Sequence, residues 1–182
     1  MITINSHLSL QPITLDDQKR LFELMQEIYP SAYGHFWKDD CSWYINHIYS
    51  SESLAKDLAT PDSHYHFIYY KSDIIGIFKY IYNQTYTPLS PLKGLKLHRL
   101  YLHPSVQGKG IGRDIMQYGE QLARRLDYKI IWLDAMHTHT QAQLFYKKAG
   151  YIKTEFQLLP FDLLKDEHRK MWYMHKMLPS PK

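Results

Sequence analysis

The residues best placed to do chemistry are three glycines at alternate positions in Gln107-Gly108-Lys109-Gly110-Ile111-Gly112, just after an apolar run. Glycine has no Cβ, so such a loop lets the backbone approach a bound ligand closely. A helix is predicted to begin within the loop, and its unpaired N–H groups and positive dipole end favour an anion. A simple turn needs one glycine rather than three, so we expect a phosphate-binding loop.

The spacing of the glycines separates this loop from two other nucleotide-binding loops. A P-loop needs four residues between its glycines and then Gly-Lys-Ser/Thr, which the sequence lacks. A dinucleotide-binding loop needs G-x-G-x-x-G directly after the strand and an acid about 20 residues later. Asp134 is a candidate for that acid, but the glycines follow G-x-G-x-G and begin several residues past the strand. A dinucleotide-binding oxidoreductase is therefore the less favoured alternative.

The strand that leads into the loop is predicted over residues 97–103. Leu100 and Leu102 point to one of its sides, and Arg99 and Tyr101 to the other. The proline that follows ends the strand, because it has no N–H to donate.

A helix over 110–126, with Leu126 on its core side, and a strand over 130–136 follow the loop. The second strand is a nearly continuous apolar run, which is typical of a strand buried on both faces. Residues 97–136 therefore form a β-α-β unit, in which the two strands are parallel and the crossover is right-handed.

Further elements complete the predicted fold. They are a strand within 1–13, a helix from the Thr14 cap to Pro30, a helical region over 40–58 broken at Ser50-Ser51, a hairpin of strands 65–70 and 74–82, a loop over 83–92, a helix over 140–148 closed by a left-handed Gly150, and strands 151–158 and 170–177. No repeat or domain break interrupts the sequence, so we expect a single α/β domain over 1–182 with six or seven strands.

Composition limits the classes of ligand and partner. The 182 residues are 45% hydrophobic and 22% charged, and the formal net charge of +4 suits an anionic small ligand. No basic run exceeds two residues, so nucleic acid is not expected. No apolar run approaches the roughly 18 residues of a membrane span, and no signal peptide is expected. Cys41 is the only cysteine, which excludes an internal disulfide and favours a cytoplasmic location.

Two motifs resemble those of a known family. Gln107 to Gly112 resembles the Q/R-x-x-G-x-G/A acyl-CoA motif of the GNAT superfamily of N-acyltransferases, and Leu100-Tyr101-Leu102-His103-Pro104 resembles the strand before it. Ala142 and Phe145-Tyr146-Lys147-Lys148-Ala149-Gly150-Tyr151 resemble the family's A-x-x-(F/L)-Y-x-K-x-G-F signature. The resemblance is strong over 95–156. It implies a GNAT-like mixed, mostly antiparallel, twisted sheet flanked by helices, with a central β-α-β unit that binds acyl-CoA.

The resemblance also implies which residues hold acetyl-CoA, the acyl donor. The pyrophosphate would lie on the backbone N–H groups of Gln107, Gly108, Lys109, Gly110, Ile111 and Gly112, with Arg113 nearby. The pantetheine arm would pair with the strand edge at Leu100, Tyr101 and Leu102. The site would be completed by His139, where the family often has asparagine, and by Ala142, Phe145 and Tyr146.

Tyr146 is the implied catalytic acid, because it matches the family tyrosine that protonates the departing thiolate. Many members carry a glutamate base on the central strand, but Lys96-Leu97-His98-Arg99 contains no carboxylate. His98 is the nearest substitute, since imidazole can accept a proton near neutral pH. The alternatives are His137, His139, and Asp134 acting through a water. A metal is not expected, because His137-Thr138-His139 has no third ligand at a suitable spacing.

The resemblance implies transfer of an acetyl group from acetyl-CoA to a primary amine of a small molecule or peptide, by direct attack in a ternary complex. Cys41 lies too far from the motifs to suggest a covalent relay. A non-catalytic acyl-CoA sensor is the alternative from another class, and pairing into a homodimer stays open. An aromatic run either holds the amine by cation–π contact or packs a loop between helices: Tyr29, Tyr33, His35, Phe36 and Trp37.

Overall fold

The computed structural model describes residues 1–89 and 92–179. The chain forms two compact units that alternate along the sequence. The first unit holds Met1–Lys79 and Arg99–Gly112, and the second holds Tyr80–His98 and the chain from Arg113 onward. The prediction of a single domain over 1–182 stays a prediction.

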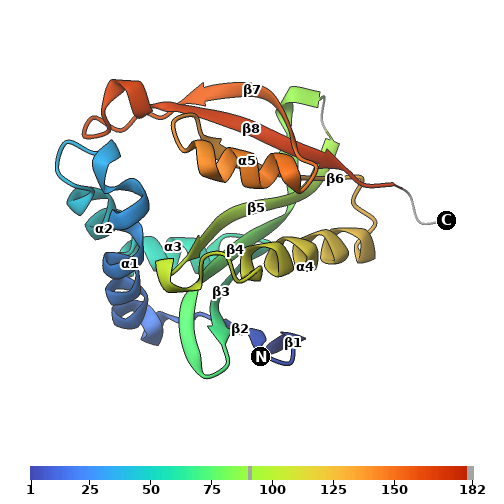
Figure 1. The fold of residues 1–182 in the computed structure, drawn as a ribbon, viewed down its shortest axis with the longest axis horizontal. Coiled ribbons are helices and arrows are strands. Elements are labelled where there is room, and N and C mark those ends of the chain that lie inside the picture. The colour runs from blue at the N-terminus through green and yellow to red at the C-terminus, as the bar shows by residue number, and fades with distance from the viewer. Residues whose placement is uncertain (90–91, 180–182) are drawn as a thin grey trace. The chain divides into compact units, whose positions relative to one another are not determined.

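The described residues contain eight strands rather than six or seven. These are β1 (Ile2–Asn5), β2 (Leu8–Pro12), β3 (Ser63–Tyr70), β4 (Asp73–Tyr86), β5 (Leu92–Leu102), β6 (Ile130–Met136), β7 (Ile152–Leu158) and β8 (Lys170–Met177). Their hydrogen-bonded order is β1-β2-β3-β4-β5-β6-β8-β7 (Figure 1). The extra strand arises because residues 1–13 fold back as a hairpin. The Asn5 side chain accepts a hydrogen bond from the His7 N–H at 3.0 Å, which stabilises the turn.

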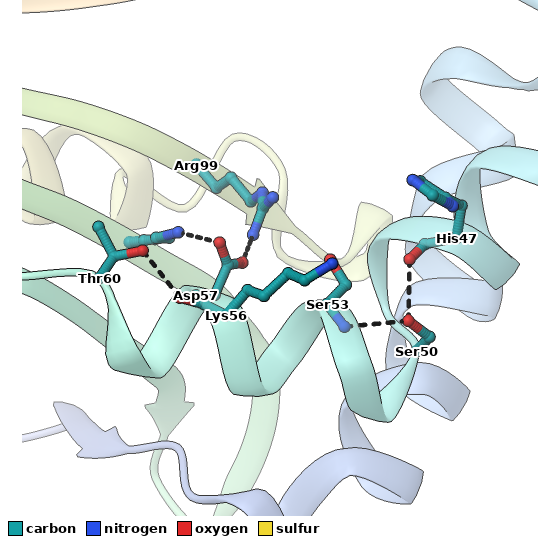
Figure 2. A network of polar contacts seen from close by, with 8 residues as sticks. His47, Ser50, Ser53, Lys56, Asp57, Thr60 and Arg99 are labelled. Carbon is teal, nitrogen blue, oxygen red and sulfur yellow. Dashed lines mark hydrogen bonds and ion pairs between the residues drawn. The ribbon is translucent and has the colours of Figure 1, made fainter.

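Five α-helices accompany the strands in the described residues. They are α1 (Gln18–Tyr33), α2 (Ser42–Ile48), α3 (Ser51–Ala59), α4 (Ile111–Arg125) and α5 (Thr140–Lys148). The predicted stop at Pro30 is wrong, because α1 continues to Tyr33. Proline there removes one N–H in the last turn, while the rings of Tyr29 and Tyr33 stack at 4.8 Å and hold that turn helical. The predicted break at Ser50 is confirmed, since its hydroxyl accepts from the Ser53 N–H at 3.1 Å and caps α3 (Figure 2).

The predicted parallel pairing is confirmed in the second unit, where β5 runs parallel to β6. The paired residues run from Leu95–Ile131 to Leu97–Leu133, so this pairing stops well before β5 ends. The helix between the strands matches α4, but Leu126 lies past its end and is 45% exposed rather than in the core.

The predicted loop over 83–92 is wrong in its first part. β4 continues through Tyr86, since the Tyr128 hydroxyl bonds both the N–H and the side chain of Asn83 and keeps the chain on the sheet. A 3₁₀ turn over Thr87–Leu89 follows, Ser90 and Pro91 lie outside the described residues, and β5 begins at Leu92.

Lys176 of β8 identifies the face of the second unit's strands that packs against α4 and α5. Its ammonium group lies 2.8 Å from Glu120 of α4 and donates to the Ala149 carbonyl at the end of α5, also at 2.8 Å. Alternation along the strands then places Trp132 and Asp134 of β6 on the opposite face. No helix in the described part of the chain is long and apolar enough to cross a membrane.

Candidate active site

The glycine loop lies in the first unit between β5 and α4. Gly108 has φ +76° and Gly110 has φ +81°, a left-handed conformation that L side chains rarely adopt. A Cβ on Gly108 would meet nothing within 4 Å, so the backbone conformation rather than crowding requires glycine there. Gln107 and Lys109 are exposed, and α4 begins at Ile111. The loop therefore presents its backbone to solvent at the start of a helix, as an anion site requires.

His103 holds the start of this loop, a role that the sequence did not reveal. Its Nδ1 accepts a hydrogen bond from the Ser105 N–H at 3.1 Å, so the ring proton sits on Nε2. Nε2 lies 3.0 Å from a carboxylate oxygen of Glu27 in α1. These contacts tie the end of β5 to α1.

The strand edge proposed for pantetheine also belongs to the first unit. The His103 N–H donates to the Ile75 carbonyl of β4 at 2.7 Å, which occupies one edge of the strand end. The pairing of β5 with β6 on the other side ends at Leu97. Leu100, Tyr101 and Leu102 are half-buried beyond that point. The strand therefore has the form needed to pair with an extended ligand.

Tyr101 directs its ring into an aromatic cluster formed with Tyr29, Tyr33 and Tyr44. Tyr29 stacks on Tyr44 at 4.6 Å, and Tyr101 meets Tyr29 and Tyr33 edge-on at 5.6 Å each. Burial raises the pKa of Tyr29 and of Tyr101 well above the usual value, so both phenols stay neutral.

The aromatic run that could have formed an acceptor wall is divided by the structure. Phe36 and Trp37 are buried, like Tyr29. Tyr33 is half-buried and His35 is exposed. Most of the run therefore packs the junction between α1 and α2.

A charged network joins the C-terminal part of β5 to α3 and β4. Asp57 of α3 bonds the guanidinium of Arg99 (Figure 2), and Lys79 of β4 donates to the same carboxylate at 2.5 Å. The Lys79 side chain is 2% exposed and Arg99 10%. Burial raises the pKa of Asp57, but the charge of Arg99 and the hydrogen bond from Lys79 outweigh it and leave the pKa below its usual value. The sequence signal for this network was a lone lysine within the apolar β4.

The second unit carries Tyr146 on α5. Its ring is half-buried and lies 5.3 Å from Phe145 and 6.2 Å from Tyr151. Burial raises the pKa of Tyr146 to about 12, so the phenol is protonated at neutral pH. A protonated phenol can act as a general acid.

His139 caps the N-terminus of α5. Its Nδ1 accepts from the Ala142 N–H at 3.2 Å, so its Nε2 carries the proton. Gln143, which the sequence did not single out, donates to the carbonyls of Met136, at 2.9 Å, and His137. It thereby joins α5 to the end of β6. Ala142 is half-buried, and Arg113 on α4 is exposed.

The candidate bases of the second unit differ in their surroundings. His98 is half-buried on β5. Asp134 receives the ammonium of Lys96 at 2.6 Å, and that ammonium also lies 4.4 Å above the Trp132 ring. The other carboxylate oxygen of Asp134 is buried with no hydrogen-bond partner among the described residues.

Two further residues that the sequence raised as candidates lie in different units, His137 in the second and Cys41 in the first. His137 is exposed and accepts from the indole N–H of Trp172 at 2.9 Å. Cys41 is fully buried, and burial followed by the charges of Asp39 and Asp40 raises the pKa of its thiol to about 11. Its thiol is therefore a poor nucleophile at neutral pH. The described residues contain no cluster of three or more metal-ligating side chains.

A family model described as the acetyltransferase (GNAT) family matches residues 20–151, most of the chain. The chain belongs to the GNAT acetyltransferase family. The predicted recognition and the mixed α/β GNAT fold are thereby confirmed, with eight strands in place of six or seven. The expectation of an acyl-CoA-dependent N-acyltransferase is confirmed at the level of the family.

Individual relatives agree with this assignment. An uncharacterized N-acetyltransferase in the pepI 3′ region of Lactobacillus delbrueckii subsp. lactis is 23% identical over 112 residues, 62% of this chain. The chain spans slightly less than two thirds of that relative, 65%.

Solved structures share the fold at low identity. The PaiA N-acetyltransferase from Thermoplasma acidophilum, in complex with coenzyme A, has a TM-score of 0.67 at 18% identity, with 94% of this chain and 99% of that chain covered. The spermidine N-acetyltransferase from Vibrio cholerae, in complex with CoA and spermine, has a TM-score of 0.66 at 15% identity, with 95% and 96% covered.

Proposed function

We propose that this protein transfers the acetyl group of acetyl-CoA to a primary amine of a small molecule or peptide by direct attack in a ternary complex. The observation that carries the proposal is the strand and loop of the first unit in a chain of the GNAT family. Gly108 and Gly110 turn the backbone in the left-handed conformation just before α4, and Leu100–Leu102 lie past the pairs that β5 forms with β6.

The residues of each unit suit a different part of acetyl-CoA. The N–H groups from Gln107 to Gly112 would bind the pyrophosphate, with the positive end of α4 and Arg113 adding charge. The edge of Leu100–Leu102 would hydrogen-bond the amides of pantetheine. His139 at the N-terminus of α5, and Ala142 and Phe145 on that helix, would contact the same arm.

The chemistry requires one proton donor and one proton acceptor. The neutral amine nitrogen attacks the thioester carbonyl carbon, the C–S bond breaks, and the sulfur leaves with the bonding pair. Tyr146 donates its phenolic proton to that sulfur. The proton lost by the amine passes to His98, or to Asp134 through a water.

Several classes of amine are candidates for the acceptor. The spermine in the Vibrio cholerae relative makes polyamines the first amines to assay. Amino acids, antibiotics and peptide N-termini complete the panel. The single cysteine favours the cytoplasm as the place of action.

The proposal is tested by release of the CoA thiol against this panel, with the mass of the acetylated amine as confirmation. Amine-dependent thiol release supports it. Tight CoA binding without turnover on any amine supports the sensor instead. A rise in melting temperature with NAD but not with CoA would favour the oxidoreductase.

A further inference from the structure

A cavity of about 490 Å³ lies in the second unit, where α5 runs alongside β7 and β8 (Figure 1). It is lined by Thr140, Gln143, Leu144, Lys147, Tyr151, Ile152, Lys153 and Met174. Its volume falls within the range of about 300–1,000 Å³ typical of small-molecule sites.

The walls of this cavity combine aliphatic and polar side chains, and two of the aliphatic ones are open to water. Leu144 of α5 is 57% exposed and Ile152 of β7 is 59% exposed, and the buried Met174 of β8 also lines the cavity. Large aliphatic side chains exposed around a concave surface are typical of a ligand site.

The charge of the lining is of one sign. Lys147 comes from α5 and Lys153 from β7, and none of the eight lining residues is acidic. The Lys153 ammonium lies 5.2 Å from the centre of the Trp172 ring. Two basic side chains from separate elements favour a carboxylate, while the aliphatic side chains favour an apolar chain. The lining therefore matches an amphipathic anion.

Most of the α5 residues that line the cavity are turned away from Ala142 and Phe145, two residues assigned to acetyl-CoA. Thr140, Leu144 and Lys147 are three or four residues apart and share one side of the helix. Gln143 is three residues from Tyr146, so the inner end of the cavity borders the proposed acid. The outer part at Leu144 and Lys147 lies on the side of α5 away from Ala142.

Tyr151 connects the two faces. It lines the cavity, is 1% exposed, and its ring lies 6.2 Å from that of Tyr146. A ligand in contact with Tyr151 would therefore act on the residue whose ring lies next to Tyr146, the proposed acid.

We propose that this cavity binds a small amphipathic carboxylate, with its apolar chain on Leu144, Ile152 and Met174 and its carboxylate between Lys147 and Lys153. Occupancy changes the rate of acetyl transfer through Tyr151 and Tyr146. This second part rests on the proposed function, whereas the binding site does not.

The binding test titrates decanoate, below its micelle concentration, into the full chain by calorimetry, with and without saturating CoA. Saturable one-to-one binding in both cases is expected, with at least a tenfold loss of affinity in the double variant Lys147→Glu, Lys153→Glu. Lys148→Glu, which changes the next residue outside the cavity, is the matched control and should bind normally.

Three binding results would overturn the site. They are no binding of decanoate, equal binding by the double variant, and equal binding of uncharged decanol. A concentration-dependent dimer that Leu144→Lys dissociates would likewise overturn it, because a second copy would then cover the cavity. Circular dichroism of each variant checks that it is folded.

The rate test adds saturating decanoate to the acetylation assay. A change in kcat of twofold or more, absent in the double variant, is expected. Binding with an unchanged kcat overturns the connection through Tyr151 and leaves the site standing. If no amine is acetylated at all, the proposed function fails, and calorimetry alone decides the site.

Discussion

At the scale of single residues, Tyr146 is the proposed acid. Tyr146→Phe keeps the ring but removes the proton donor, so kcat should fall roughly 100-fold. KM for acetyl-CoA should change little, because the ring packing against Phe145 is retained. Steady-state kinetics measures both constants.

Tyr128→Phe is the control for this change, since it removes a hydroxyl that bonds Asn83. It should leave kcat near the wild-type value. An unaltered kcat in Tyr146→Phe would remove Tyr146 as the acid.

The base is tested by the pH dependence of kcat/KM. If His98 takes the amine proton, wild type loses activity as the pH falls and the imidazole becomes protonated. His98→Ala should flatten that acidic limb and lower kcat/KM roughly 100-fold at neutral pH. A profile of His98→Ala that matches wild type, together with a lost limb in Asp134→Asn, would transfer the role to Asp134.

Sequence identified residue types at the site better than their partners. Gly108 and Gly110 in the loop and Gly150 after α5 all have positive φ, as the sequence predicts for these positions. His139, by contrast, gives its Nδ1 to capping α5, which only the position of the Ala142 N–H reveals.

At the scale of elements, Asp57 joins α3 to β4 and β5. Asp57→Asn leaves two buried cations without their carboxylate, so it should lower the free energy of unfolding by about 3–5 kcal/mol. Urea unfolding measures the loss. Asp166→Asn, which breaks an exposed pair with Arg169, is the control and should have little effect.

The acid sensitivity of that network has a definite sign. The native pKa of Asp57 lies below its unfolded value of about 3.9, so its contribution is complete above that pH. It is lost as the pH falls through the lowered native pKa. The stability difference between wild type and Asp57→Asn should therefore shrink in acid. A constant difference would mean that the carboxylate charge is not its source.

Gly76 allows β4 to approach the strand proposed for pantetheine. A Cβ there would collide with the Tyr101 carbonyl and lie 3.1–3.2 Å from Leu102 atoms. Gly76→Ala should therefore shift β5 and raise KM for acetyl-CoA several-fold. Gly94→Ala, whose Cβ would meet the Ile130 carbonyl at 2.5 Å, crowds the other end of β5 and is the control. Equal effects on KM in both variants would contradict a role specific to Tyr101.

Elements with a strong local pattern were predicted closely. The predicted strands 130–136 and 170–177 and helix 140–148 match β6, β8 and α5. The failures at Pro30 and at 83–92 share a cause, since side-chain contacts extend an element past a local breaker. The ring of Tyr33 stacks on Tyr29 across Pro30, and Tyr128 holds Asn83.

At the scale of the whole molecule, two motifs in the right order were enough to predict the family and its fold. The residues that fix the strand ends were not predictable in the same way. Asp57 is 22 residues from Lys79 and 42 from Arg99, and no local pattern encodes such pairings. The alternation of the two units along the chain likewise emerges only from the folded structure.

The central claim is direct acetyl transfer in a ternary complex. It is tested most directly by the initial rate of CoA release at varied acetyl-CoA and several fixed concentrations of an active amine. Double-reciprocal lines that intersect are the predicted result, because both substrates must be bound before the thioester is attacked. Parallel lines, with an acetylated protein isolated in the absence of amine, would contradict it.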